Sequence, residues 1–216
     1  MQLKGRQGFT LLECLVVVSI LAVLLLLSLP LAQKLRQVSG KVKCLSNLRQ
    51  LGTAGLQYSI EHRGRLPITD WYAADPMEKM WYTKVAQYVY PDHRPGESCY
   101  YPLFRCPAVD AVRKRPKVDV YRGANIDYGA IFAAPPKWLL YKPIYMQQVD
   151  GHRSSVALLM EADADGHGGP YDERTFSIIV GPALSRHGGS INIFYCDGST
   201  RQVQNATWAD LYSTSP

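Results

Sequence analysis

The sequence predicts an α+β fold: a long N-terminal helix, transmembrane in its first half and amphipathic in its second, packed on a small antiparallel β-sheet head. Three observations predict it. The run Phe9–Leu29 is apolar and contains a single Asp, Glu, Lys or Arg side chain. Apolar residues at helical spacing continue beyond it, which favours one face of an amphipathic helix. Fourteen tyrosines, four tryptophans and short alternating segments further on favour strands.

The apolar run is long enough to cross a membrane. At ~1.5 Å per residue, a helix over Phe9–Leu29 spans the ~30 Å hydrocarbon core. Lys4 and Arg6 precede it, which predicts a cytoplasmic N-terminus. A cleaved signal peptide fits poorly, because its apolar region is usually shorter and Leu29–Gln33 makes a poor cleavage site. A plain anchor fits the length but leaves Glu13 unexplained, since a carboxylate in the bilayer costs at least ~2.5 kcal/mol.

The segment Gly8-Phe9-Thr10-Leu11-Leu12-Glu13 resembles the processing site of type IV prepilins and of the pseudopilins of type II secretion. The resemblance implies that a prepilin peptidase removes residues 1–8 by cutting after Gly8, and that Phe9 is then N-methylated. It also implies a pilin-like fold and a structural rather than enzymatic role. Glu13 would pair with the N-terminus of a neighbouring subunit in a filament, which offsets the cost of burying both charges.

The same resemblance implies the partners and the location. The partners are the peptidase and methylase, other pilin-like subunits and the inner membrane. The head would lie outside the cytoplasm on a single-pass anchor.

We expect the helix to continue from residue 30 to residue 62 as its amphipathic half. Its apolar stripe, meant to pack on the head, comprises Leu31, Leu35, Val38, Val42, Leu45, Leu48, Leu51, Gly55 and Tyr58. Pro30 bends the helix axis, and His62-Arg63-Gly64 is typical of a helix end. About 185 residues follow the membrane segment, which is enough for one globular domain. Residues 63–216 are therefore predicted to form a single β-rich head.

Within the head we predict one short helix over Met77–Tyr90 and several strands. The first strand lies within Val118–Phe132, and Ser154–Met160 reads as a buried strand. Ser190–Cys196 alternates in polarity and is followed by Asp197-Gly198, a strong tight-turn dipeptide, so residues 199–204 would form the return strand of a hairpin.

His187, nine further residues and Asp197-Gly198 are similar to the H-X9-DG element of a subfamily of prepilin-like proteins abundant in planctomycetes and verrucomicrobia. The segments Cys44–Gly52 and Phe104–Pro107 also resemble that subfamily. We expect His187 and Asp197 to hold the hairpin by hydrogen bonds. A tethered extracytoplasmic enzyme using these two residues is the alternative, but no nucleophile accompanies them.

Four of the five cysteines would lie outside the cytoplasm, where disulfides persist. Their pairing stays open, and we favour Cys99–Cys106 because the two are close in sequence. We predict no cofactor and no metal site, because there is no C-x-x-C and the histidines are scattered. Glu161, Asp163 and Asp165 precede glycines and are weak candidates for calcium, because the distal glutamate of a calcium loop is missing.

The net charge of +6 is a mild excess and does not by itself indicate nucleic-acid binding, which we do not expect. The basic cluster at residues 113–117 lacks interleaved aromatic residues, so a solvated loop is the simpler interpretation. A membrane-tethered module that binds calcium or a polyanion, and never polymerises, remains the alternative to a filament subunit.

Overall fold

The computed structural model describes residues 11–68, 80–92, 102–107, 126–130, 144–162 and 180–211 except 182 and 185, without the side chains of 31, 33, 36 and 37. The chain divides into two compact units, Met1–Ser39 and Gly40–Pro216. Helix α1, Leu11–Glu61, begins in the first unit and continues into the second. The structure confirms the α+β class, with an apolar N-terminal helix and a small antiparallel sheet.

In the first unit, α1 is a helix with an apolar surface. Every described residue from 11 to 30 is exposed, and the large apolar ones expose between 46% and 85% of their surface. Leu11–Pro30 has a mean hydropathy of 2.8, so this stretch is long and apolar enough to cross a membrane. Pro30 lies inside the helix, as predicted from its place between two apolar patterns.

In the second unit, α1 buries one face in the head. Leu48, Leu51 and Tyr58 are almost completely buried, which confirms this part of the predicted stripe. The stripe is wrong at Val42, which exposes 62% of its surface. Burial begins only at Cys44, where a disulfide joins the helix to a loop of the head.

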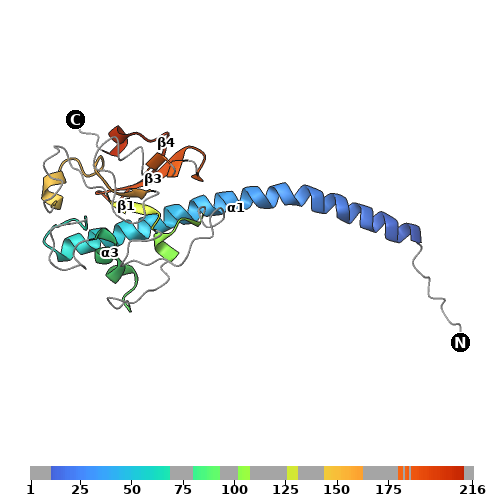
Figure 1. Ribbon diagram of the computed structural model, residues 1–216, viewed down its shortest axis with the longest axis horizontal. Helices are drawn as coiled ribbons and strands as arrows, with labels where there is room; N and C mark the ends of the chain where they lie inside the picture. The colour runs from blue at the N-terminus through green and yellow to red at the C-terminus, as the bar shows by residue number, and fades with distance from the viewer. Residues whose placement is uncertain are drawn as a thin grey trace. The chain divides into compact units, whose positions relative to one another are not determined.

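Four short strands form the sheet: β1 (Tyr128–Ala130), β2 (Ala157–Glu161), β3 (Ser190–Tyr195) and β4 (Thr200–Gln204). Their order is β1-β2-β3-β4 and each neighbouring pair is antiparallel. The predicted hairpin is confirmed, with Ser190 opposite Gln204 and Phe194 opposite Thr200. Figure 1 shows the strands and helix α3 (Trp81–Val89) beside the C-terminal part of α1.

Both faces of β3 are covered. Phe194 packs in one cluster with Leu48 and Leu51 of α1, and Ile191 and Ile193 pack in a second cluster on the opposite face. The second cluster is completed by Val180, Ala183 and Leu184 and by the 3-10 helix η4 (Trp208–Leu211). All six residues of β3 are therefore buried, whereas alternation alone suggests one face toward solvent.

The remaining described elements are short. They are η1 (Pro102–Phe104), which leads into Cys106, and η3 (Met146–Val149). Helix α3 lies inside the predicted range Met77–Tyr90 and buries Lys84, whose Nζ donates to the carbonyl of Ile68 at 2.8 Å. Helix α1 ends one residue before the predicted His62, and Gly64 follows with a φ of +86°.

Candidate functional site

Glu13 lies in the first turn of α1, within the exposed apolar stretch. Gly8 and Phe9, the predicted processing residues, lie outside the described residues. A helix with this much exposed apolar surface is stable in water only when a membrane or other helices cover it. The apolar surface of the first unit therefore needs lipid or other helices to cover it, and the Glu13 carboxylate lies near the start of that surface.

The head carries a disulfide that the sequence analysis did not find. Cys44 of α1 is bonded to Cys106 in the loop after η1, with a Cα–Cα distance of 5.2 Å and a sequence separation of 62. The predicted pair Cys99–Cys106 is therefore wrong, because Cys106 already has a partner; Cys99 itself lies outside the described residues. Asn47, one turn after Cys44, donates its Nδ2 to the carbonyl of Arg105 at 3.0 Å. This bond aligns the helix with the segment Arg105–Cys106, called the cysteine loop below.

Of the other cysteines described, Cys14 is exposed and Cys196 is buried, and both are free thiols. Burial, aided by the neighbouring Asp197 carboxylate, raises the pKa of the Cys196 thiol to about 12. The thiolate is the reactive form of cysteine, so Cys196 is inert at neutral pH.

The ring of His187 faces the core. His187 is buried, and its Nε2 lies 3.3 Å from Oε1 of Glu161 and 3.4 Å from Sγ of Cys106. Ser190 Oγ donates to the His187 carbonyl at 3.0 Å, which fixes the start of β3. The ring of His187 therefore links the start of the hairpin to β2 and to the disulfide.

Asp197 works at the other end of the hairpin. One of its carboxylate oxygens accepts the N–H of Ser199 at 2.8 Å, and Gly198 has a φ of +85° that the tight turn requires. Among the described contacts, none joins the Asp197 and His187 side chains. Because His187 is 1% exposed, a substrate cannot reach it without opening the core.

Glu161 lies at the end of β2 and is 1% exposed. Its two carboxylate oxygens accept hydrogen bonds from the backbone N–H and the Nδ2 of Asn192 on β3, at 3.0 and 2.9 Å. Glu161 therefore points into the head and is already satisfied there. The other two weak calcium candidates, Asp163 and Asp165, lie outside the described residues, and Glu161 is engaged with Asn192.

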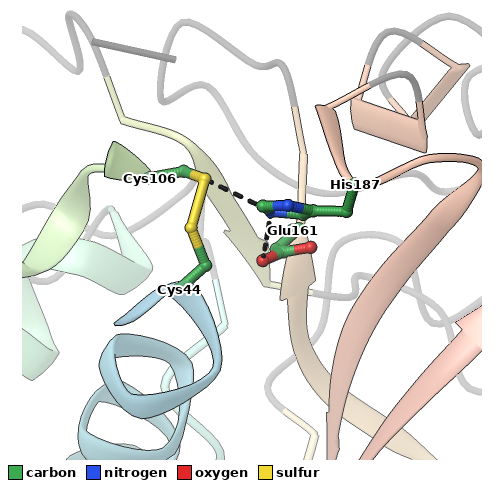
Figure 2. A group of neighbouring side chains, drawn as sticks. All are labelled: Cys44, Cys106, Glu161 and His187. Atoms are coloured by element: carbon green, nitrogen blue, oxygen red, sulfur yellow. Dashed lines mark hydrogen bonds and ion pairs between the residues drawn. A yellow bond between two sulfur atoms is a disulfide. The ribbon is translucent and has the colours of Figure 1, made fainter. Parts of the chain in front are cut away.

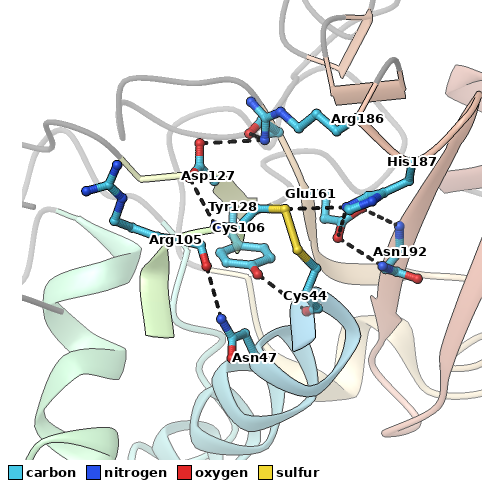
Figure 3. The surroundings of a disulfide bond; sticks show 11 residues. Cys44, Asn47, Arg105, Cys106, Asp127, Tyr128, Glu161, Arg186, His187 and Asn192 are labelled. Atoms are coloured by element: carbon cyan, nitrogen blue, oxygen red, sulfur yellow. Dashed lines mark hydrogen bonds and ion pairs between the residues drawn. A yellow bond between two sulfur atoms is a disulfide. The ribbon is translucent and has the colours of Figure 1, made fainter. Parts of the chain in front are cut away.

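A buried ion pair lies beside the disulfide (Figure 3). Asp127 accepts the N–H of Cys106 at 3.0 Å and lies 3.6 Å from Nη1 of Arg186. Next to it, the Tyr128 hydroxyl donates to the Cys44 carbonyl at 3.3 Å. Burial and the nearby carboxylates of Glu161 and Asp127 raise the pKa of Tyr128, so it stays protonated and remains a donor. The network ties α1, the cysteine loop and strands β1, β2 and β3 together.

Figure 2 shows what sequence reasoning missed: Cys44, Cys106, Glu161 and His187 converge on one point. Their ligand atoms all lie within 4.8 Å of one another, and all four residues are buried. They come from α1, the cysteine loop, β2 and the turn before β3. No local spacing reveals the group, because each member is distant from the others in sequence. The one signal in the sequence was that Cys44, Cys106 and His187 lie in the segments that resemble the subfamily.

The comparison with known families bears on the first unit. Residues 3–29 match the prokaryotic N-terminal methylation motif. No curated protein and no solved structure matches the chain. The motif covers residues 3–8 of the predicted leader, the cleavage site, Glu13 and the predicted membrane segment. Together with the exposed apolar helix it supports membrane anchoring and a prepilin-like protein of the type IV pilin and pseudopilin kind.

Proposed function

We propose that this chain is a structural subunit of a type IV pilus or a type II secretion pseudopilus. The observation that carries the proposal is the methylation motif at residues 3–29 placed on a helix whose apolar surface is uncovered. In this proposal a prepilin peptidase cuts after Gly8 on the cytoplasmic side of the inner membrane, and Phe9 becomes the methylated N-terminus. The chain's role is structural, and the chemistry is done to it by the processing enzymes.

Assembly buries the first unit of many copies in a common helical bundle. The apolar residues Leu35, Val38 and Val42 are also exposed and lie beyond the membrane segment in sequence. In the filament, neighbouring subunits cover these residues, which the bilayer does not reach. Burying a side chain of this size is worth roughly 1.5–3 kcal/mol. Glu13 then sets the register, because its carboxylate pairs with the amino group of a neighbour's Phe9 and neither charge is buried alone.

The head supports an extracytoplasmic location and the H-X9-DG subfamily. A buried Cys44–Cys106 disulfide is typical of oxidising compartments. The motif residues His187, Asp197 and Gly198 shape both ends of the β3–β4 hairpin, which gives the spacing a structural reason. These contacts support the subfamily assignment as part of the proposal.

Substituting Glu13 tests the assembly step. Glu13→Gln keeps the size of the side chain and removes its charge, so the neighbour's N-terminus is left unpaired. Breaking one partner of a buried ion pair costs about 3–5 kcal/mol. We expect the variant to reach the membrane at the parent level but to disappear from sheared filaments and from crosslinked multimers.

Cys14→Ala is the matched control, because Cys14 is the next residue of the same exposed turn and carries no charge in the proposed pair. It is expected to assemble as the parent does. Normal assembly of Glu13→Gln would contradict the proposal and favour a tethered module that does not polymerise.

A further inference from the structure

We propose that Cys44, Cys106, Glu161 and His187 form a structural zinc site that becomes available when the Cys44–Cys106 disulfide is reduced. Two thiolates, an imidazole and a carboxylate are ligands that Zn²⁺ accepts in tetrahedral sites. The inference concerns the head alone and does not depend on filament assembly.

The distances in the cluster fit a tetrahedral ion. Zinc bonds of about 2.3 Å to sulfur and about 2.0 Å to nitrogen or oxygen place sulfur about 3.5 Å from nitrogen, and nitrogen about 3.3 Å from oxygen. His187 Nε2 lies 3.4 Å from Cys106 Sγ and 3.3 Å from Glu161 Oε1. Two edges of the polyhedron are therefore already in place. The fourth ligand, the Cys44 sulfur, lies within 4.8 Å of the other three ligand atoms.

The surroundings favour a closed, structural site. All four residues are buried, which leaves no open coordination position for a substrate or a bulk water. Asn192 holds Glu161 through two hydrogen bonds, the kind of support that orients a metal-bound carboxylate. Tyr128 and Asn47 fix the backbone on either side of the two cysteines through the carbonyls of Cys44 and Arg105.

The exchange between the two states balances. A dithiol reductant gives two electrons and two protons to the Cys44–Cys106 bond, producing two thiols, and is itself oxidised to a disulfide. Zn²⁺ then displaces the two thiol protons and binds both thiolates, the Glu161 carboxylate and Nε2 of neutral His187. The sulfurs separate by side-chain rotation. The metal then replaces the covalent bond as the link between α1 and the head.

The test uses the full chain in detergent, either oxidised or reduced with a dithiol and freed of reductant. Zinc bound after dialysis is measured by elemental analysis, and Co²⁺ is used as a spectroscopic probe of thiolate and tetrahedral ligation. We expect about one zinc per reduced chain and none per oxidised chain. The Co²⁺ complex of the reduced chain should show a thiolate charge-transfer band together with tetrahedral d–d bands.

Variants identify the ligands. Cys106→Ser, Glu161→Gln and His187→Gln are each expected to lower zinc affinity more than Asn192→Ala, for which the loss should be about 10–100-fold. Cys196→Ser is the matched control: it removes another buried cysteine that is no part of the cluster, and it should bind zinc as the parent does.

Folding is followed by circular dichroism in parallel, because the reduced chain can lose its structure. Recovery of the native spectrum on adding zinc supports the site. A reduced chain that stays unfolded with zinc, equal binding by the oxidised chain, or unchanged binding in Glu161→Gln and His187→Gln would each overturn the proposal.

Discussion

Gly52 lies where α1 passes directly over the ring of Phe194. A Cβ built at this position would overlap three ring atoms of Phe194. The glycine weakens the helix by about 1 kcal/mol relative to alanine, yet it allows the aromatic ring of β3 to reach the helix backbone. Close packing at this point joins α1 to the sheet. The packing requires glycine here, at the expense of helix propensity.

Gly52→Ala is therefore expected to destabilise the head although it improves helix propensity. Overpacking a filled core typically costs 1–3 kcal/mol, and we expect a loss of about that size in thermal denaturation of the full chain. Gly181→Ala is the control, since a Cβ there meets nothing within 4 Å. Adding Phe194→Leu to Gly52→Ala should recover part of the loss. A Gly52→Ala chain as stable as the parent would contradict the packing.

The raised pKa of the Cys196 thiol makes the stability of the head depend on pH. Its thiol has a pKa of about 12 in the folded head, against an ordinary value of 9.0. Above about pH 9 the unfolded chain loses this proton while the folded chain keeps it, so stability is full below that pH and falls as pH rises toward 12. The slope approaches about 1.4 kcal/mol per pH unit.

Denaturation curves at increasing alkaline pH check this expectation. The parent should lose stability more steeply than Cys196→Ser, whose hydroxyl does not titrate in that range. The raised pKa of Tyr128 is common to both chains and cancels in the comparison. Equal slopes for the two chains would show that Cys196 is not held protonated by the fold.

At the scale of elements, the Cys44–Cys106 bond joins α1 to the loop after η1. Closing a loop of 62 residues lowers the entropy of the unfolded chain and is worth about 4 kcal/mol in the chain-entropy estimate. We expect the double variant Cys44→Ser/Cys106→Ser to lose about that much stability when it is measured with a metal chelator present.

Peptide mapping of the oxidised chain provides the direct check of connectivity. A peptide pair linked through Cys44 and Cys106 is expected, and Cys196 should appear as a free thiol that is alkylated only after unfolding. A Cys99–Cys106 linked pair would contradict the structure and restore the pairing expected from sequence proximity.

The elements that the sequence predicted are those with local signals. The long helix follows from an apolar period that needs no knowledge of the head, and the β3–β4 hairpin follows from alternation ending in Asp197-Gly198. The predicted stripe on α1 starts too far upstream, because periodicity identifies an apolar face but not what covers it. Val42 belongs to the predicted stripe and is exposed.

The cluster around His187 lay beyond sequence reasoning for a physical reason. Cys44, Cys106 and Glu161 come from different elements, and only the packing of α1 on the sheet brings them together. Sequence proximity favoured a Cys99–Cys106 pair because short loops close easily. Tertiary packing decided otherwise, since Cys44 is buried on the face of α1 that the cysteine loop covers.

The chain as a whole combines an exposed apolar helix with a head that contains a disulfide bond. The first unit has no buried residue over Leu11–Pro30, so its stability depends on lipid or on other copies. The described part of the second unit has a hydrophobic cluster on each face of the sheet and the Cys44–Cys106 disulfide. These two parts fit the anchored filament subunit that we propose.

The most direct test of the account is the mass of the mature N-terminal peptide, taken from the chain isolated from membranes. We expect a peptide that begins at Phe9 and carries one added methyl group, with residues 1–8 absent. An N-terminal peptide that still begins at Met1, or one that begins beyond the apolar run, would contradict it.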